Sequence, residues 1–451
     1  MQSIDITSDF IEELKDLIEN KNNPKIVESL KDLHYADIAE IMDDLSFEEA
    51  IYVFELMDDN IVSDIIVELE EDVRKRIMRR LSSKRIASEL IDDLDTDDAA
   101  DILAELPEKK KQEVISEIED VEHAADIVEL LRYDEDTAGG LMAKELVQVN
   151  ENWMVLTCVK EMRKQAESID KVHSIYVVDD DEKLLGTLSL KSLLTTSTKT
   201  PIKEIYKKDV HFVEVNEPAD EVALIMQKYD LVVIPVIDEI GRLVGRITID
   251  DIVDVIVEEA EKDYQMASGI SQDVESSDSV WHLLRARFPW LLIGLFGSLT
   301  SGHIIGQFDD FIQQYILLIT FIPLIAAMGG NVGVQSSAII VQGLANNTIK
   351  DGGLVKRIFK EIGLSLSIGI VLSFIISIYV VTQKDPYIYA AIISTALTVV
   401  VVIAALMGTI VPLVLDKYDI DPAIATGPFI TTTNDILGVF IYFSIAHMFL
   451  N

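Results

Sequence analysis

Five apolar stretches occupy the chain after residue 285, and each is long enough to cross a bilayer as an α-helix. A membrane-spanning helix needs about 20 predominantly apolar residues. The stretches cover residues 288–307, 311–345, 359–382, 387–415 and 422–450. The second and fourth are longer than one span requires, so we expect a tilt or a break in each. The pattern predicts a five-span α-helical membrane domain.

The pattern before residue 135 differs and predicts short amphipathic helices. A triplet of a small residue, Asp and Ile recurs there, for example at Ala36-Asp37-Ile38 and Ala100-Asp101-Ile102. Recurring helical units of this kind are typical of stacked helix pairs, as in an α-helical solenoid. Ser46 and Thr96, each followed by acids, are the expected N-caps of two of these helices.

Residues 136–258 alternate between strand and helix patterns. Two segments repeat one plan of helix, strand, turn, strand and helix, with strand pairs at 174–178 and 184–190, and at 232–237 and 243–249. An acidic helical stretch then runs from Asp254 to about Trp281 and is expected to lead directly into the membrane. The predicted fold class is multidomain: an α-helical solenoid, two α/β modules, a connecting helix and the five-span domain. The expected boundaries are 1–134, 135–200, 201–258, 259–284 and 285–451.

Charge separates the two halves of the chain. The net charge is −40, and residues 286–451 hold nine acids and seven bases, so the first 285 residues carry −38. Such acidity repels nucleic acid and attracts cations. Cys158 is the single cysteine, which excludes a thiolate cluster and leaves oxygen ligands, suited to hard ions such as Mg2+, Ca2+ or Mn2+.

Asp435 is the only carboxylate between Pro422 and Leu450, and an ionisable group at membrane depth is a functional-site hypothesis by default. Its neighbours Thr431, Thr432, Thr433 and Asn434 form a short polar run. A second run, after Pro323, contains Gly329, Gly330, Asn331 and Gln335.

We interpret both runs as helix breaks whose oxygens line a cation pathway, because irregular backbone at this depth is tolerated only along a wet cavity or inside protein. For the glycines, the alternative is close helix packing. For Asp435, the alternative is a neutral or hydrogen-bonded acid with a structural role. One carboxylate per chain is few for a divalent ion. A homodimer would supply two, which suffices for a partly hydrated Mg2+.

Basic residues predict the orientation of the spans. Arg285 and Arg287 precede the first span, and Lys350, Lys356, Arg357 and Lys360 lie between the second and third. Basic loops favour the cytoplasmic side. The first 20 residues mix acids with apolar positions and lack a continuous apolar core, so we expect no secretory signal before residue 30. We therefore expect a multi-pass protein of the plasma membrane with its N-terminus in the cytoplasm and its C-terminus outside.

The two repeated segments resemble tandem CBS domains, through the runs IYVVDDDEKLLGTLSLKSLL and VIPVIDEIGRLVGRITIDDIV. The resemblance implies a regulatory module that can bind an adenine nucleotide such as ATP. The second repeat keeps the family's Gly-x-x-Thr-x-x-Asp pattern at Gly245, Thr248 and Asp251. The first repeat has Ser189 and Ser192 at the corresponding positions, so one nucleotide site, at Thr248 and Asp251, is expected.

The whole chain resembles the MgtE-type magnesium transporter family. The order of modules carries this resemblance, together with PLIAAMGGNVGVQSS in the second span and DPAIATGPFITTTNDILGVFIYF in the fifth. It implies a dimeric Mg2+-selective channel with Asp435 at the ion site, closed when cytoplasmic Mg2+ binds at acidic domain interfaces. The residues to which it assigns the regulatory metal are Asp97, Asp101, Asp220, Asp230, Asp251, Asp254, Glu259, Asp263 and Asp421.

Two other functions fit parts of the pattern. A transporter of Co2+ or Mn2+ would use the same oxygen ligands, and ion competition would separate the two. A membrane sensor with CBS domains and no transport would show no flux. An enzyme is disfavoured, because the seven histidines show no metal-ligand spacing and no nucleophile motif accompanies them.

Overall fold

A computed structural model describes residues 7–167, 169, 171–272, 274, 279–345, 349, 354–418, 420–425 and 427–450. The chain divides into two compact units, Met1–Ile256 and Val257–Asn451. Lys350, used above for the orientation of the spans, lies outside the described residues. The fold class predicted from the sequence is confirmed in both units.

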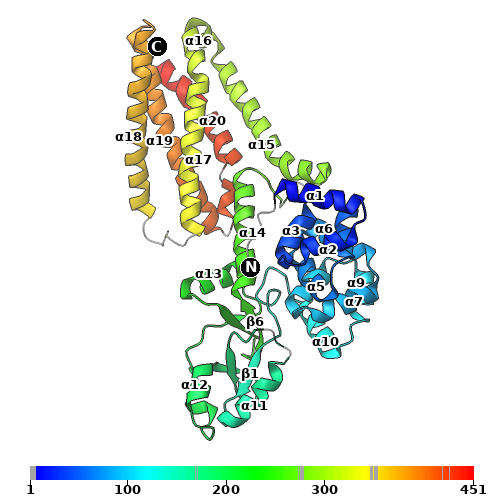
Figure 1. The fold of residues 1–451 in the computed structure, drawn as a ribbon. Helices are drawn as coiled ribbons and strands as arrows, with labels where there is room; N and C mark the ends of the chain where they lie inside the picture. The colour runs from blue at the N-terminus through cyan, green and yellow to red at the C-terminus, as the bar shows by residue number, and fades with distance from the viewer. Residues whose placement is uncertain are drawn as a thin grey trace. The chain divides into compact units, whose positions relative to one another are not determined.

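The first unit begins with short helices joined by tight turns (Figure 1). Their apolar faces meet in a common core in which Ile41, Met42, Phe54 and Ile65 are almost fully enclosed. The helices are α1 (Ser8–Glu19), α2 (Asn23–Leu30), α3 (Tyr35–Asp43), α4 (Phe47–Phe54), α5 (Asp59–Glu68), α6 (Glu71–Arg80), α7 (Ser83–Glu89), η1 (Ile91–Asp93), α8 (Thr96–Ala104), α9 (Glu108–Ile115) and α10 (Val121–Leu130).

Of the two N-caps predicted from the sequence, one is confirmed. Ser46 forms a capping box with Glu49 at the start of α4. Thr96 does not cap α8, because Asp95 occupies the cap position and Thr96 is already the first helical residue. The Thr96 hydroxyl instead donates to Glu145, at 2.9 Å. A residue expected to serve one helix thus joins that helix to the segment that enters the first α/β module.

Two three-stranded sheets follow the helices, one in each predicted module. In each sheet a short parallel strand precedes an antiparallel pair, and the two predicted pairs are confirmed. The sequence did not indicate the parallel strands, which are only four and two residues long. The elements are β1 (Val147–Asn150), α11 (Val155–Gln165), β2 (Ile175–Val178), β3 (Leu184–Leu188), α12 (Leu190–Thr195), η2 (Ile202–Glu204), β4 (Val213–Glu214), α13 (Ala219–Tyr229), β5 (Val233–Ile237) and β6 (Leu243–Thr248).

The second sheet shares one hydrophobic core with the amino-terminal helices. Ile234 and Ile247 from this sheet and Ile102 from α8 belong to the same cluster of buried side chains. The first sheet has a separate small core around Val147, Val177 and Cys158. The acidic helix α8 is therefore held next to the second module by ordinary apolar packing.

The connecting helix, α14 (Ile249–Ala267), starts immediately after β6. The sequence suggested that this helix leads directly into the membrane domain, but it does not. The helix ends at Ala267, and Gly269 follows with a positive φ of 82°, a conformation that favours glycine. The next helix begins at Val280.

Among its described residues, the second unit contains five helices long and apolar enough to cross a membrane, and they are labelled in Figure 1. The core of this unit lies where α17, α19 and α20 meet, around Ile325, Val401 and Phe443. Its helices are α15 (Val280–Gln307), α16 (Asp309–Gln314), η3 (Ile316–Phe321), α17 (Ile322–Ala345), α18 (Leu354–Thr382), α19 (Tyr387–Lys417), η4 (Pro422–Ala425) and α20 (Gly427–Leu450).

The two predicted helix breaks at the polar runs were wrong. α17 is a continuous helix through Gly329, Gly330 and Asn331, and α20 is continuous through Asp435. The irregular segments come earlier, at η3 before α17 and at η4 before α20. The glycines of α17 serve close packing instead, since a helix without side chains on one face lets its neighbours approach.

Candidate cation sites

Asp435 is positioned by a tight contact between α17 and α20. The neighbouring side chain, Asn434, is buried, and its Nδ2 donates to the carbonyl oxygen of Gly329 at 3.4 Å. A Cβ on Gly333 would lie only 2.1 Å from the same nitrogen. The two helices can therefore approach this closely only because position 333 has no side chain.

Helix geometry places Asp435 between two packed faces of α20. Thr431 and Asn434 meet α17, whereas Thr432 meets α15 at Gly297, where a Cβ would lie 1.9 Å from the threonine methyl group. Since an α-helix turns about 100° per residue, Asp435 points between these faces. The side chain is half-buried. It is thus supported by packed neighbours on both sides but is not sealed inside the unit.

One face of α17 is exposed although it carries two amides. Pro323, Ala327, Asn331 and Gln335 recur every four residues along this face, and all four are exposed in the single chain. We call them the α17 stripe. Amide side chains at membrane depth face a protein interior or a wet cavity rather than lipid. The α17 stripe therefore indicates a surface that is covered by protein or lined by water.

The first unit holds an acidic pocket at the amino-terminal end of α8, with a cavity volume of about 180 Å3. Carboxylate oxygens of Asp95, Asp97 and Glu145 lie within 4.8 Å of one another, which is close enough for one metal ion to contact all three. The residues that line the pocket are Asp64, Asp93, Leu94, Asp95, Asp97, Asp98, Lys171, His173, Arg246, Thr248, Asp250 and Asp251.

The carboxylates of this α8 pocket disfavour one another's ionisation. Burial and the carboxylates of Asp251 and Asp98 hold the pKa of Asp97 well above its usual range. Burial, and after it the carboxylate of Asp251, raises the pKa of Asp98 to about 7. Asp251 itself has a pKa raised by burial, although two hydrogen bonds from Thr248 oppose the shift. A divalent cation would reverse the sign of these interactions.

Hydrogen bonds that need no metal also join the start of α8 to β6 and to Glu145, across the interface between α8 and the second α/β module. Arg246, from β6, donates to the backbone oxygen of Glu145 and pairs with Asp95 at 3.2 Å. Thr96 donates to Glu145 through both its backbone N–H and its hydroxyl. Thr248 donates to Asp251 at 2.6 Å, so these two residues, expected to contact nucleotide, already bond to each other at the start of α14. The interface therefore has a polar framework of its own.

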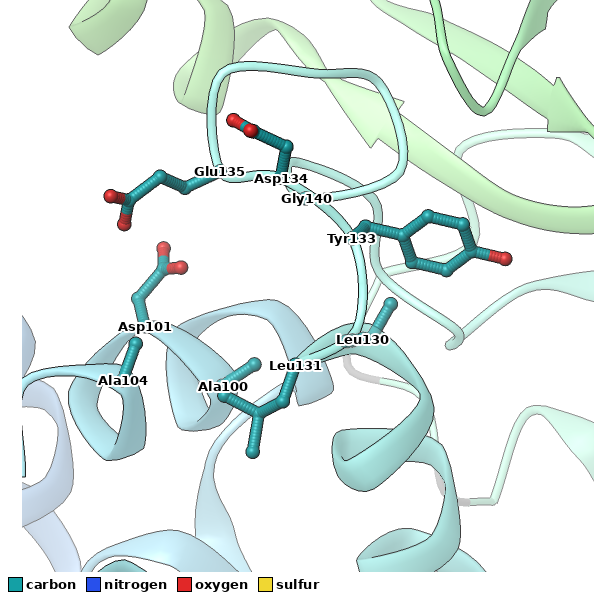
Figure 2. Close-up of a pocket in the computed structure, with 9 residues that line it drawn as sticks. All are labelled: Ala100, Asp101, Ala104, Leu130, Leu131, Tyr133, Asp134, Glu135 and Gly140. Carbon is teal, nitrogen blue, oxygen red and sulfur yellow. The ribbon is translucent and has the colours of Figure 1, made fainter. Parts of the chain in front are cut away.

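A second acidic pocket lies beside the first, with a cavity volume of about 240 Å3. Figure 2 shows the carboxylates of Asp101, from α8, and Glu135, from the loop after α10, pointing toward each other, with Asp134 beyond them. Partial burial and the Glu135 carboxylate raise the pKa of Asp101 to about 7, although Asp101 remains open to solvent on one side.

In the second unit, the end of α14 lies against the start of α20. A Cβ on Gly427, whose φ is 41°, would lie 2.3 Å from the carbonyl oxygen of Ala267. A Cβ on Gly269 would lie 2.5 Å from Pro428. Burial and the carboxylate of Asp421 raise the pKa of Asp263 on α14. The structure thus brings together the two predicted regulatory acids Asp263 and Asp421. Asp419, in the sequence between α19 and Asp421, lies outside the described residues.

Four of the predicted regulatory acids are not gathered in this way. Asp220 and Asp230 are exposed at opposite ends of α13, with Asp230 in the left-handed conformation at the helix end. Asp254 and Glu259 are exposed on α14, and Glu259 pairs with Lys262 at 3.5 Å. Within one described chain they form no common site.

Sequence reasoning missed two residues at the α8 pocket: Arg246, which lines it, and Glu145, whose carboxylate lies near those of Asp95 and Asp97. Glu145 lies 49 residues beyond Thr96 and Arg246 lies 151 residues beyond Asp95, so no local spacing links them. Asp95 is the N-cap residue of α8 and Asp98 lies in its first turn, but a run of acids in a sequence does not show which members turn inward. Only the packing of α8 against β6 could decide that.

Comparisons with known proteins agree with the order of the modules. Residues 33–136 match the MgtE intracellular N domain, 138–198 and 202–258 match the CBS domain, and 322–445 match a family described as a divalent cation transporter. The magnesium transporter MgtE of Bacillus subtilis (strain 168) is 33% identical over 322 residues, which cover 71% of either chain. That of Enterococcus faecalis (strain ATCC 700802 / V583) is 34% identical over the same share of each.

One solved structure resembles the amino-terminal half. It is the crystal structure of the cytosolic domain of the Mg2+ channel MgtE in complex with ATP, at 31% identity and a TM-score of 0.50. The match covers 54% of this chain and 99% of that one. The likeness therefore spans the amino-terminal helices and both CBS domains.

Proposed function

This chain belongs to the MgtE family of magnesium transporters, and we propose that it is a Mg2+ channel whose pathway runs along the α17 stripe and past Asp435 of α20. The observation that carries the proposal is the α17 stripe, which lies on the helix that packs against the turn of α20 carrying Asp435. An exposed row containing Asn331 and Gln335 suits a hydrated cation and would be costly against lipid.

Two copies of the chain would complete this pathway. With the α17 stripes facing each other, two Asp435 carboxylates would flank one axis, and the amides would contact the hydration shell of the ion. Mg2+ dehydrates reluctantly and is commonly held by one or two carboxylates through its waters. The backbone near Gly329 and Gly330 would then shape the walls rather than bind the ion, because its carbonyls belong to a continuous helix. A homodimer in the plasma membrane is therefore the assembly we propose.

Cytoplasmic Mg2+ would close the channel by binding the acidic pockets. An ion held by Asp97, Asp98 and Asp251 favours the arrangement in which α8 and the second CBS domain are in contact. Each further pocket, such as that of Asp101, adds its own differential affinity and sharpens the response. Arg246 and Thr96 would keep the interface partly joined when Mg2+ is absent.

The contact between α14 and α20 supplies the route from sensor to pore. Asp263 and Asp421 lie close enough to raise a pKa, so an ion between them would hold the end of α14 against the start of α20. Asp254, Glu259, Asp220 and Asp230 are exposed and would need a second chain or a different arrangement to take part. We keep them as proposed regulatory residues on the family resemblance.

ATP is the second ligand that we propose, at the CBS domains. The support is the likeness to an MgtE cytosolic domain solved with ATP, together with the Gly-x-x-Thr-x-x-Asp pattern at Thr248 and Asp251. Measuring ATP binding to the native chain and to Thr248→Val would test it. Unchanged affinity would reject Thr248 as a ligand.

Mg2+ uptake into proteoliposomes tests the transport proposal. The native chain should take up Mg2+, and Asp435→Asn, which keeps the size of the side chain, should lose most of the uptake while retaining its fold. Asp310→Asn, an exposed acid of α16, is the matched control and should behave as native. Competition by Co2+ and Mn2+ separates a Mg2+ channel from a general divalent cation transporter. Absence of native uptake under every condition would favour a sensor without transport.

A further inference from the structure

Glu361 is the only acid besides Asp435 within the apolar stretches that the sequence shows. It lies on α18, inside the third candidate span. An acid at this position is costly and needs a polar partner. The hydroxyl of Ser336, on α17, donates to Glu361 Oε1 at 2.7 Å. Ser336 is only 6% exposed, so this is a contact inside the helix bundle.

A glycine on α19 explains how the Glu361 side chain reaches α17. α18 packs along α19, and α19 presents Gly408 to α17 at this level. A Cβ on Gly408 would lie 2.2 Å from the carbonyl oxygen of Gly333 and 3.1 Å from Cβ of Ser336. The missing side chain therefore lets α17 lie directly on α19, within reach of Glu361.

Ser336 is on the same helix that carries the proposed pathway, one turn beyond Gly333. Gly333 contacts Asn434, the residue before Asp435. On a helical wheel Ser336 lies about 140° from Asn331 and about 100° from Gln335. A bond that fixes the Ser336 face therefore sets the direction in which the α17 stripe points.

We propose that Glu361 is a positioning residue for the cation pathway, which holds the rotation of α17 through its bond to Ser336. This inference rests on the proposed function, because it assigns the pathway to the α17 stripe. A positioning role for Glu361 differs from a role as a second ion ligand. The Ser336 face is turned away from the stripe, and the Glu361 carboxylate is engaged there by the Ser336 hydroxyl.

Paired substitutions separate positioning from charge. Glu361→Gln keeps an acceptor oxygen and loses the charge, whereas Glu361→Leu and Ser336→Ala each remove the bond. We expect Glu361→Gln to transport like the native chain. Each of the other two should lower Mg2+ uptake about five- to tenfold, as for loss of one buried hydrogen-bond partner, and should change the ratio of Mg2+ to Co2+ uptake. The double variant Glu361→Leu/Ser336→Ala should be no worse than either single one.

Several outcomes would overturn the inference. Native uptake and ion preference in Glu361→Leu would show that the bond positions nothing that matters for transport. Equal loss in Glu361→Gln and Glu361→Leu would assign Glu361 a role through its charge. If Glu361→Leu fails to fold, Glu361→Gln and Ser336→Ala decide the matter. A native chain without uptake would instead contradict the proposed function, so the two failures are distinguishable.

A second measurement does not depend on transport. In the full chain with Cys158→Ser, which removes the single cysteine, Gln335→Cys would place a thiol on the α17 stripe. Its rate of labelling by a charged thiol reagent reports how the stripe faces water. Addition of Ser336→Ala should change this rate several-fold, and addition of Glu361→Gln should not. An unchanged rate with Ser336→Ala would reject the positioning role.

Discussion

Carboxylates are used in opposite ways in the α8 pocket and on α20. In the α8 pocket, Asp97, Asp98 and Asp251 lie together, and each has a pKa raised by burial, with the neighbouring acids adding to it. On α20, Asp435 is the only acid of its span, with Asn434 beside it. A crowded set favours a cation that stays, because bound charge relieves the repulsion. A single carboxylate with amides favours a cation that passes. Under the proposed function, this difference separates sensing in the α8 pocket from conduction past Asp435.

The largest effect is expected where α17 and α20 meet. Gly333→Leu would place a side chain where a single Cβ already lies 2.1 Å from Asn434 Nδ2. Forced overpacking of this kind costs about 1–3 kcal/mol or more. Uptake should be lost and the membrane unit destabilised, as measured by flux and thermal unfolding in detergent. Gly363→Leu, where nothing lies within 4 Å of a Cβ, is the control. Equal damage by both would contradict the packing account.

Neutralising the α8 pocket should have the next largest effect. In Asp97→Asn/Asp98→Asn/Asp251→Asn, repulsion is removed but Mg2+ can no longer bridge the acids. Uptake should therefore stay high at cytoplasmic Mg2+ concentrations that close the native chain. Glu28→Gln, on the exposed side of α2, should be inhibited as the native chain is. Inhibition unchanged in the triple variant would reject this pocket as the sensor, and a variant closed at every concentration would show that bridging is unnecessary.

The raised pKa values predict a pH dependence. Asp98 has a pKa of about 7 in the folded chain against 3.8 for the isolated group, so the folded state holds more protons between these values. Without Mg2+, stability of the first unit should therefore fall as pH rises from about 4 to 7. Mg2+ binds the ionised form, so it should raise the unfolding temperature more at pH 8 than at pH 6. Thermal unfolding with and without Mg2+ would show this, and equal stabilisation at both values would contradict it.

The polar framework should make a smaller contribution. Thr96→Val removes the hydroxyl bond to Glu145 and the acceptor of the Lys144 backbone N–H, and should destabilise the first unit by about 1–2 kcal/mol. It should also raise the Mg2+ concentration needed for closure modestly. Thr7→Val, an N-cap at the exposed start of α1, controls for loss of a hydroxyl outside the interface. A shift in Mg2+ dependence in Thr7→Val alone would contradict the assignment.

The sequence was sufficient to predict those elements and candidate residues that a local or periodic pattern of residues marks. Five apolar stretches predicted the five spans, alternation predicted the strand pairs, and the isolated charge of Asp435 marked it as a candidate. It was insufficient where distant residues meet. Glycine at 329, 330 and 333 fits a helix break and a packing surface equally well, and only the continuous helix with its contacts to Thr431 and Asn434 distinguishes the two. Glu145 and Arg246 could not be assigned to the α8 pocket without the packing of β6 against α8.

One measurement tests the division between sensing and conduction most directly. Mg2+ uptake should be recorded against cytoplasmic Mg2+ for the native chain, for Asp435→Asn and for the triple Asn variant of the α8 pocket. Native uptake should fall as cytoplasmic Mg2+ rises, Asp435→Asn should be low throughout, and the triple variant should be high throughout. An Asp435→Asn chain that conducts normally, or a triple variant inhibited like the native chain, would contradict the account.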